Sequence, residues 1–383
     1  MKKFNAVSLF ANVGVAETYL SEVGIDVVVA NEIDPIRAKF YSHLYPKTNM
    51  IIGDITNDEI QGKIIESCND NNVDFLIATP PCQGMSLAGK MDPLDPRNQL
   101  TYYAIKIILA IKPKYVLLEN VPQLLKTKIR INDEELLIPE YIHKELDKYY
   151  NFAEQSLVSA KDYDVPQMRK RNIFLLSRKD MKYTWQMPKP KKIITLKDAI
   201  YNLPSVDPIL KEGYEETIKL FPNFEKKKEE ALNVSKFHHP PKHAKKHVIA
   251  MMHTPSGCTA FDNVEYYPKK DNGKRVNGHY NTYRRLDWDK PCRTITQNSG
   301  VISSLCCVHP GREYISIGGE KLYSDPRCLT IYELFIVSSL PKDWNVPDWA
   351  DDKLIREVIG EGIPPMLIKN IVSNLIDNIE KKS

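Results

Sequence analysis

The chain has 383 residues, of which 42% are apolar, and its net charge is +4. This length permits two hydrophobic cores, and this composition is typical of a globular protein and excludes a disordered one. No apolar stretch reaches the roughly 18 residues of a membrane span, and the N-terminus lacks the pattern of a signal peptide. The seven cysteines include no C-x-x-C pair. We therefore expect a cytoplasmic protein with free thiols, no metal site and no membrane partner.

Residues 4–180 alternate between strand-like and helix-like segments. The expected strands are Phe4–Phe10, Asp26–Asn31, Val73–Ala78, Tyr115–Glu119 and Ile173–Ser177. The expected helices are Ala16–Val23, Ile36–Leu44, Tyr102–Ile111 and Tyr141–Tyr150. Such alternation predicts an α/β fold with a doubly wound, mostly parallel sheet that is covered on both faces.

The composition changes after residue 182. Residues from about 183 to 300 are rich in Pro, Lys, His, Asn and Tyr and contain few periodic apolar segments. This texture predicts a second, smaller and loop-rich domain. From Asp352 onward, apolar residues return at helical spacing, and the pair Pro364-Pro365 divides them. We therefore expect the last helix to start at Pro365.

A turn with the pattern of a nucleoside site follows the first strand. It reads Phe10-Ala11-Asn12-Val13-Gly14, and Glu32 ends the next strand about 20 residues later. Backbone at such a turn can approach a nucleoside, and the carboxylate can bind ribose hydroxyls. Asp54 ends a third strand-like segment and could face an adenine amino group. The single glycine argues against a pyrophosphate loop, and the alternative is an ordinary turn with a solvated Glu32.

Two further strands end at turns that carry reactive side chains. The run Val73–Ala78 meets Pro80 and Pro81, which force a turn, and Cys82 follows at the carboxyl edge of the predicted sheet. The strand that ends at Glu119 also stops before a proline. If the two strands are neighbours, a nucleophilic thiol and a proton donor whose pKa is raised by burial share one pocket.

A pair of arginines precedes the last expected strand of the first domain. Arg169 and Arg171 are two residues apart, and hence on one side of an extended segment. Two guanidiniums suit a phosphate or an oxyanion, and they lower the pKa of a nearby thiol. Each feature has an ordinary alternative: a buried thiol, a solvated carboxylate or surface charge. A single active site explains all of them together.

These segments resemble the motifs of a known family. Pro81-Cys82-Gln83, Glu119-Asn120-Val121 and Gln167-x-Arg169-x-Arg171 resemble, in this order, the central motifs of the cytosine-C5 DNA methyltransferases. Further segments that resemble motifs of this family are Phe10-Ala11-x-x-Gly14, Asn31-Glu32, Gly53-Asp54-Ile55, Asp95–Leu100, Arg327–Pro341 and Ile359–Pro365. The chain departs from the family at Asn12 and Val15, which replace glycines, at Glu361, which replaces an asparagine, and at Ile336–Ser339.

The resemblance implies a Rossmann-like fold that uses S-adenosylmethionine. It divides the chain into a catalytic domain (1–182), a target-recognition domain (183–325) and a C-terminal segment (326–383) that returns to the catalytic domain. The implied cofactor contacts are Phe10, Ala11, Gly14, Glu32, Ile33, Asp54, Ile55 and Pro81. Cys82 would attack C6 of a flipped cytosine, Glu119 would hold its N3 and N4 edge, and Arg169 and Arg171 would hold its carbonyl or phosphate.

The implied partner is double-stranded DNA, which a monomeric prokaryotic modification enzyme would methylate in the cytoplasm, at the nucleoid. The implied DNA contacts are Gln83, Ser86, Arg97, Arg284, Arg285, Thr294 and Thr296. Two alternatives stay open, a tRNA cytosine-C5 methyltransferase of the same fold and a catalytically idle DNA-binding protein. An amino-group methyltransferase is disfavoured, because Thr79 precedes the prolines and Cys82 follows them.

Overall fold

The computed structural model describes residues 3–81, 98–131, 134–270, 272–305 and 307–382. A mixed sheet organises the first domain, with strand order β3-β2-β1-β4-β5-β10-β8, and β9 pairs with β10. Its strands are β1 (Phe4–Leu9), β2 (Ile25–Glu32), β3 (Asn49–Ile52), β4 (Phe75–Ala78), β5 (Tyr115–Asn120), β8 (Tyr150–Phe152), β9 (Leu157–Ser159) and β10 (Lys170–Arg178). The first five strands pair in parallel, whereas β10 runs antiparallel to β5, β8 and β9. The predicted doubly wound, mostly parallel sheet is confirmed.

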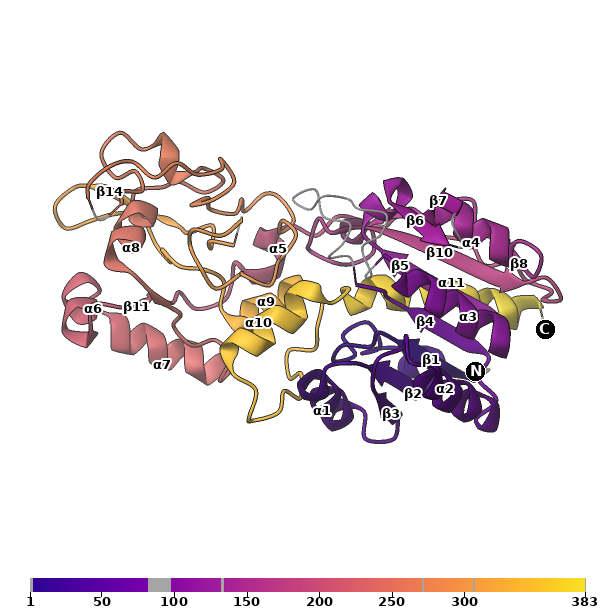
Figure 1. Ribbon diagram of the computed structural model, residues 1–383. Coiled ribbons are helices and arrows are strands. Elements are labelled where there is room, and N and C mark those ends of the chain that lie inside the picture. Colours follow the sequence, from indigo (N-terminus) through magenta and orange to yellow (C-terminus); the bar gives the residue numbers. More distant parts are fainter. Residues whose placement is uncertain (1–2, 82–97, 132–133, 271, 306, 383) are drawn as a thin grey trace.

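Helices cover both faces of this sheet (Figure 1). The further elements of this domain are α1 (Pro35–Leu44), α2 (Asp58–Asp70), α3 (Leu100–Ile111), η3 (Pro122–Lys126), β6 (Lys128–Ile131), β7 (Glu134–Leu137), α4 (Ile138–Leu146) and η4 (Ala160–Asp162). The helices α2, α3 and α4 pack on one face. The opposite face is covered by α11 (Pro365–Lys382), which starts at Pro365 as predicted. This helix, yellow in Figure 1, therefore returns to the domain in which the chain begins.

The helix predicted over Ala16–Val23 is wrong. This stretch forms turns, and only η1 (Ser21–Val23) is helical, as a single 3-10 turn. Phe10, Asn12 and Gly14 before it have φ values of 59°, 50° and 79°, and Gly24 after it has φ 82°. Within the stretch, the backbone N–H groups of Glu17, Thr18 and Leu20 donate to carbonyls three residues earlier, so successive turns replace the i to i−4 bonds of an α-helix and form a tight connection between β1 and β2.

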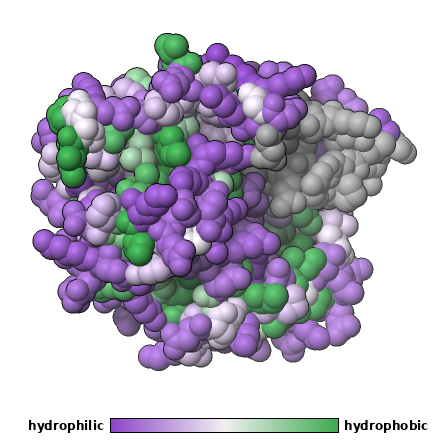
Figure 2. All heavy atoms as spheres, turned by 90° about the vertical axis from the view of Figure 1, so that its left-hand side faces the viewer, coloured by the Kyte–Doolittle hydropathy of each residue, from purple (hydrophilic) through white to green (hydrophobic). Residues whose placement is uncertain are grey.

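The second domain contains short elements joined by long connections. They are α5 (Leu196–Ile200), β11 (Ile209–Leu210), α6 (Tyr214–Leu220), α7 (Phe224–Val234), β12 (Lys242–His243), α8 (Lys245–Met252), η5 (Ala260–Asp262), β13 (Glu313–Ile315) and β14 (Lys321–Tyr323). Two further helices, α9 (Ile331–Val337) and α10 (Asp352–Glu361), lie between the two domains in Figure 1. Figure 2 looks onto the end of the molecule formed by the second domain and shows mainly hydrophilic residues there.

Two hydrophobic clusters hold this part of the molecule together. One lies within the second domain, around α8 and Phe224. The other joins α5, α9 and α10 to Val13, Val15 and Phe40 of the first domain. The second cluster places α10 directly beside the turn that follows β1. No helix among the described residues is long and apolar enough to cross a membrane.

Candidate active site

The predicted site residues gather at one edge of the sheet. The carboxyl ends of β1, β2, β4 and β5 meet there because these strands are parallel, and β10 begins there because it is antiparallel. Strand β1 lies between β2 and β4, so the strand order reverses at this point. In open α/β sheets, ligands bind at the edge beside such a reversal.

The turn after β4 is fastened to both neighbouring strands. Thr79 donates from its hydroxyl to the carbonyl of Phe10 at 3.1 Å, and the amide of Asn120 donates to the carbonyl of Pro80 at 3.0 Å. The described residues of this turn end at Pro81. The predicted site residues Cys82, Gln83, Ser86 and Arg97 therefore lie outside the described residues. The start of the turn is thus fixed between the turn that follows β1 and the end of β5.

Glu119 and Arg171 form a buried ion pair at this edge. Nε of Arg171 lies 2.7 Å from Oε1 of Glu119, and the two side chains are 11% and 7% exposed. Burial raises the pKa of Glu119, although the charges of Arg171 and Arg169 oppose this shift. The structure therefore brings together one predicted acid and one predicted cation, in a setting that favours proton retention by the acid.

Arg169 makes different contacts from Arg171. Its guanidinium donates to the carbonyls of Ile295, Gly360 and Glu361 at 2.9, 3.0 and 2.9 Å, and the residue is 3% exposed. It precedes β10 by one residue, where its long side chain reaches the backbone of the second domain and of α10. These contacts give Arg169 a connecting role between three parts of the chain, and its contact with the base or its phosphate stays a prediction.

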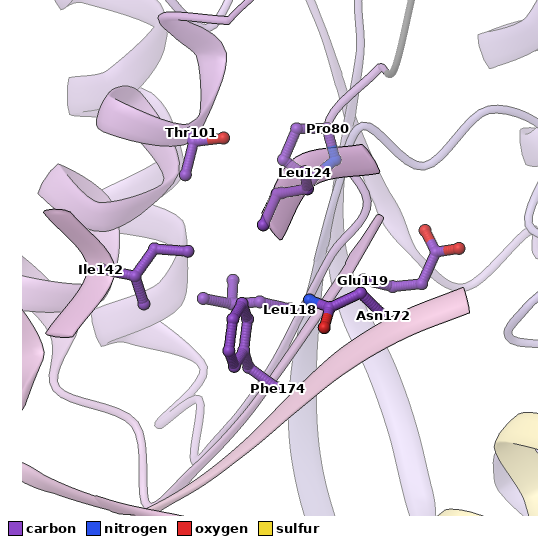
Figure 3. Close-up of a pocket in the computed structure, with 8 residues that line it drawn as sticks. All are labelled: Pro80, Thr101, Leu118, Glu119, Leu124, Ile142, Asn172 and Phe174. Carbon is purple, nitrogen blue, oxygen red and sulfur yellow. The ribbon is translucent and has the colours of Figure 1, made fainter. Parts of the chain in front are cut away.

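A small cavity lies beside the ion pair (Figure 3). Its volume is about 10 Å³, and its lining residues are Pro80, Thr101, Leu118, Glu119, Leu124, Ile142, Asn172 and Phe174. This volume suffices for about one water molecule. The carboxylate of Glu119 points away from Ile142 and Phe174 in Figure 3. Among the described residues, neither the Asn172 amide nor the Thr101 hydroxyl has a hydrogen-bonding partner.

The cofactor end of the site is built around Glu32. Its Oε2 accepts from the backbone N–H of Asn12 at 2.8 Å, and its Oε1 accepts from that of Asp34 at 2.9 Å. A carboxylate has lone pairs for further donors, so Glu32 can still bind ribose hydroxyls. Ile33 beside it is 61% exposed and offers an apolar face for a purine. These residues fit an adenosine group.

The other predicted cofactor contacts differ in their exposure. Ala11 and Ile55 are buried, Phe10 and Pro81 are half-buried, and Asp54 is exposed. Gly14 has a φ of 79°, and a Cβ there would collide with the Tyr45 ring, so this turn requires glycine. Glu32 therefore lies beside a turn of fixed shape, at the sheet edge where the cofactor is expected.

The comparisons with known proteins agree with this geometry. A family model described as C-5 cytosine-specific DNA methylase matches residues 4–377. The chain belongs to this C-5 cytosine-specific DNA methylase family. Its activity is therefore methylation of cytosine C5 in DNA.

Individual relatives extend the comparison. The Type II methyltransferase M1.HgaI of Avibacterium volantium is 39% identical over 98% of this chain and 99% of its own length. M.XorII, a Type II methyltransferase of Xanthomonas oryzae pv. oryzae, is 30% identical over 52% of this chain and 46% of its own length. A putative DNA modification methyltransferase encoded within an E. coli prophage has a TM-score of 0.66 at 21% identity, over 99% of this chain and 100% of its own. This last likeness shows a shared fold.

The predicted DNA contacts of the methylase differ in accessibility. Arg284 stacks on the ring of Tyr280, with its guanidinium carbon 4.6 Å from the ring centre, and donates to the carbonyl of Gly257 at 2.5 Å. Tyr280 is 56% exposed. Thr294 donates to the carbonyl of Met168 at 3.2 Å, and both Thr294 and Thr296 are half-buried. Arg284 is thus half-buried and stacks on an exposed aromatic ring.

Arg285 does not occupy a DNA-contacting position. It is 1% exposed, and its guanidinium donates to the carbonyls of Met251, His309, Asp325 and Tyr323. An arginine enclosed in this way joins segments of the second domain and cannot reach a nucleic acid. The sequence prediction for Arg285 is therefore corrected to a structural role.

Sequence reasoning did not predict the contacts of three polar residues at this edge of the methylase. Asn120 was part of a recognised motif, but its contact with Pro80 followed only from the pairing of β4 with β5. Asn172 lies opposite Asn120 in the β5–β10 pair. The sequence feature that could have identified it is a polar residue within an otherwise apolar strand. Arg37 pairs with Glu361, 324 positions away, a separation that no local pattern predicts.

Proposed function

We propose that this methylase transfers a methyl group from S-adenosylmethionine to C5 of a flipped-out cytosine in a specific duplex DNA sequence. The observation that carries the proposal is the buried Glu119–Arg171 pair, which lies beside the fastened turn that leads into Cys82. The Type II names of the relatives support a role as the modification enzyme of a restriction-modification system. We further propose that the protein acts as a monomer on nucleoid DNA in the cytoplasm.

The reaction begins with Cys82. Its thiolate attacks C6 of the cytosine, the Sγ–C6 bond forms, and the electrons of the C5–C6 double bond become available at C5. Bound S-adenosylmethionine supplies the methyl group that C5 receives. A water molecule then removes the C5 proton, the C5–C6 double bond forms again, and the Sγ–C6 bond breaks to release the thiolate.

Glu119 and Arg171 support the attack. A carboxyl group whose pKa is raised by burial keeps its proton to higher pH, and a protonated Glu119 can donate to N3 of the ring. This hydrogen bond stabilises the charge that develops on the ring as the thiolate adds. Arg171, which already contacts Glu119, can orient it and donate to the base carbonyl. The base must leave the duplex for this chemistry, which costs a few kcal/mol.

Glu32, Ile33 and the turn Phe10–Gly14 are proposed to hold the adenosine half of the cofactor. Arg284, Thr294 and Thr296 are proposed DNA contacts, together with Gln83, Ser86 and Arg97. Because phosphate contacts release counterions, DNA affinity should fall steeply as the salt concentration rises.

A covalent trap tests the proposal. A duplex with 5-fluorocytosine at the target position lacks the removable C5 proton, so the Sγ–C6 bond should persist through denaturing electrophoresis when S-adenosylmethionine is present. Target duplexes come from methylome sequencing of cells that express the protein. The variant Cys82→Ser should bind the duplex but form no adduct. Adduct formation by Cys82→Ser, or by a tRNA and not by DNA, would overturn the proposal.

A further inference from the structure

Three parts of the chain meet at Gly360-Glu361-Gly362, where α10 ends. A Cβ on Gly360 would lie 2.5 Å from the backbone nitrogen of Gln297, in the second domain. A Cβ on Gly362 would lie 2.8 Å from Cβ of Val15, in the turn after β1. Arg169, just before β10, holds the carbonyls of Gly360 and Glu361. The turn is therefore wedged between the two domains without room for further atoms.

The side chain of Glu361 is the centre of a polar cluster at this junction. Its Oε2 accepts from the amide of Asn12 at 2.6 Å and from Nη1 of Arg37 at 2.5 Å. Its Oε1 accepts from Nη2 of Arg37 at 2.9 Å and from the amide of Gln297. These donors come from the turn after β1, from α1 and from the second domain. Glu361 thus connects segments that are distant in sequence.

This cluster is less exposed and contains more hydrogen bonds than an ordinary surface ion pair. The side chains of Arg37 and Glu361 are 25% and 19% exposed, and the contact is bidentate. Exposed ion pairs contribute about 0–1 kcal/mol, whereas bidentate pairs with additional donors are held in one geometry. The amides of Asn12 and Gln297 supply those additional donors.

The cluster is joined directly to the proposed cofactor site. Asn12 donates through its side chain to Glu361 and through its backbone to Oε2 of Glu32. Arg37 lies in the first turn of α1, whose N-cap Asp34 donates its backbone N–H to the other oxygen of Glu32. Asn12 also has a φ of 50°, a conformation that asparagine tolerates better than most residues. Glu32 and Glu361 are therefore connected through Asn12 and through the start of α1.

Asn12 and Glu361 are both departures from the family pattern, and here they contact each other. We propose that Asn12, Arg37, Gln297 and Glu361 form an interlocked unit that positions the Phe10–Gly14 turn and Glu32 for the cofactor and fixes the second domain against this site. They are positioning residues. This inference rests on the proposed cofactor site.

A double-mutant cycle tests whether the residues act as a unit. The variants are Asn12→Gly, Glu361→Asn and their combination, and each substitution introduces the residue typical of the family. The control is Glu59→Gln, on the exposed face of α2. Binding of S-adenosylhomocysteine, measured by calorimetry, requires no turnover. Each single variant should raise the dissociation constant about tenfold. The double variant should bind no more weakly than the weaker-binding single variant, because coupled residues lose one shared interaction. The control should bind like the parent protein.

A second measurement separates positioning from general stability. KM for S-adenosylmethionine should rise about tenfold in each single variant, while kcat at saturating cofactor changes less. Effects that multiply in the double variant, or urea midpoints that fall with an unchanged dissociation constant, would overturn the positioning unit alone. Absence of binding by the parent protein would overturn the proposed cofactor site as well.

Discussion

At the scale of single residues, the most unusual group outside the proposed chemistry is Glu17. It is 4% exposed beneath the turn after β1, where the hydroxyl of Ser8 donates to its Oε1. Its Oε2 has no hydrogen-bonding partner among the described residues. The rings of Tyr41 and Tyr45 lie against the same space, because a Cβ on Gly14 would touch all three side chains. A carboxylate enclosed in this way is costly to ionise.

This burial predicts a specific dependence of stability on pH. Desolvation raises the pKa of Glu17 to about 7 from 4.5, so between these values the folded protein keeps a proton that the unfolded chain releases. The pKa shift of Glu17 therefore contributes about 3 kcal/mol to the free energy of unfolding below pH 4.5. This contribution is lost as the pH rises to 7. Glu17→Gln cannot ionise and should be more stable than the parent protein at pH 8.

Urea unfolding of both proteins from pH 5 to pH 8 checks this prediction. The difference in free energy of unfolding should grow with pH up to about 7 and then stay constant. Glu229→Gln, at an exposed position of α7, removes the same charge without burial and should show no such growth. An equal pH dependence in Glu17→Gln and the parent protein would contradict the assignment.

At the scale of elements, neighbouring arginines show how one extended segment serves two purposes. Arg284 and Arg285 each lie in an isolated bridge, with Thr259 and Val308 respectively. Successive side chains of an extended segment point to opposite sides. One guanidinium therefore stacks on exposed Tyr280, and the other fills the interior of the second domain.

Alanine substitutions at these two positions should separate stability from DNA binding. Arg285→Ala leaves buried carbonyls without donors and should lower the free energy of unfolding by about 3 kcal/mol or more. Arg284→Ala should change it by about 1 kcal/mol or less, yet weaken duplex binding and reduce its salt dependence, if Arg284 contacts phosphate. Urea unfolding and fluorescence-anisotropy titrations at several salt concentrations measure both effects. Equal destabilisation by the two substitutions would contradict this division of roles.

The same two arginines show how far sequence reasoning reaches. Strand ends at Pro80 and Glu119 were predictable because an apolar run stopped at a proline or a carboxylate, and local chemistry fixed the turn. The burial of Arg285 was not predictable, because two adjacent arginines look equivalent in sequence until the segments that pack against them are known. The antiparallel direction of β10 and the contact of Arg37 with Glu361 likewise depend on distant segments. Local patterns thus located the edge of the site, and tertiary packing decided which residues reach it.

At the scale of the whole molecule, the chain closes on itself through α11. This helix begins directly after the junction at Glu361 and covers the face of the sheet opposite α2, α3 and α4. Its buried apolar residues are Leu367, Ile368, Ile371, Val372, Leu375, Ile376 and Ile379. The indole of Trp185 also donates to the carbonyl of Ile371 at 3.1 Å. A parallel sheet requires cover on both faces, and α11 supplies much of one of them.

Removal of α11 should therefore prevent folding of the whole domain that contains the mixed sheet. Each of its large buried side chains contributes about 1.5–3 kcal/mol, and their sum is comparable to the 5–15 kcal/mol that stabilises a typical domain. A chain that ends at Pro364 should show neither a cooperative thermal transition nor resistance to limited proteolysis. A chain that ends at Glu380 retains the seven buried apolar residues of α11 named above and should behave like the full-length protein. A cooperative transition in the shorter chain would mean that the sheet is stable with one face uncovered, and that α11 contributes mainly to the junction around Glu361.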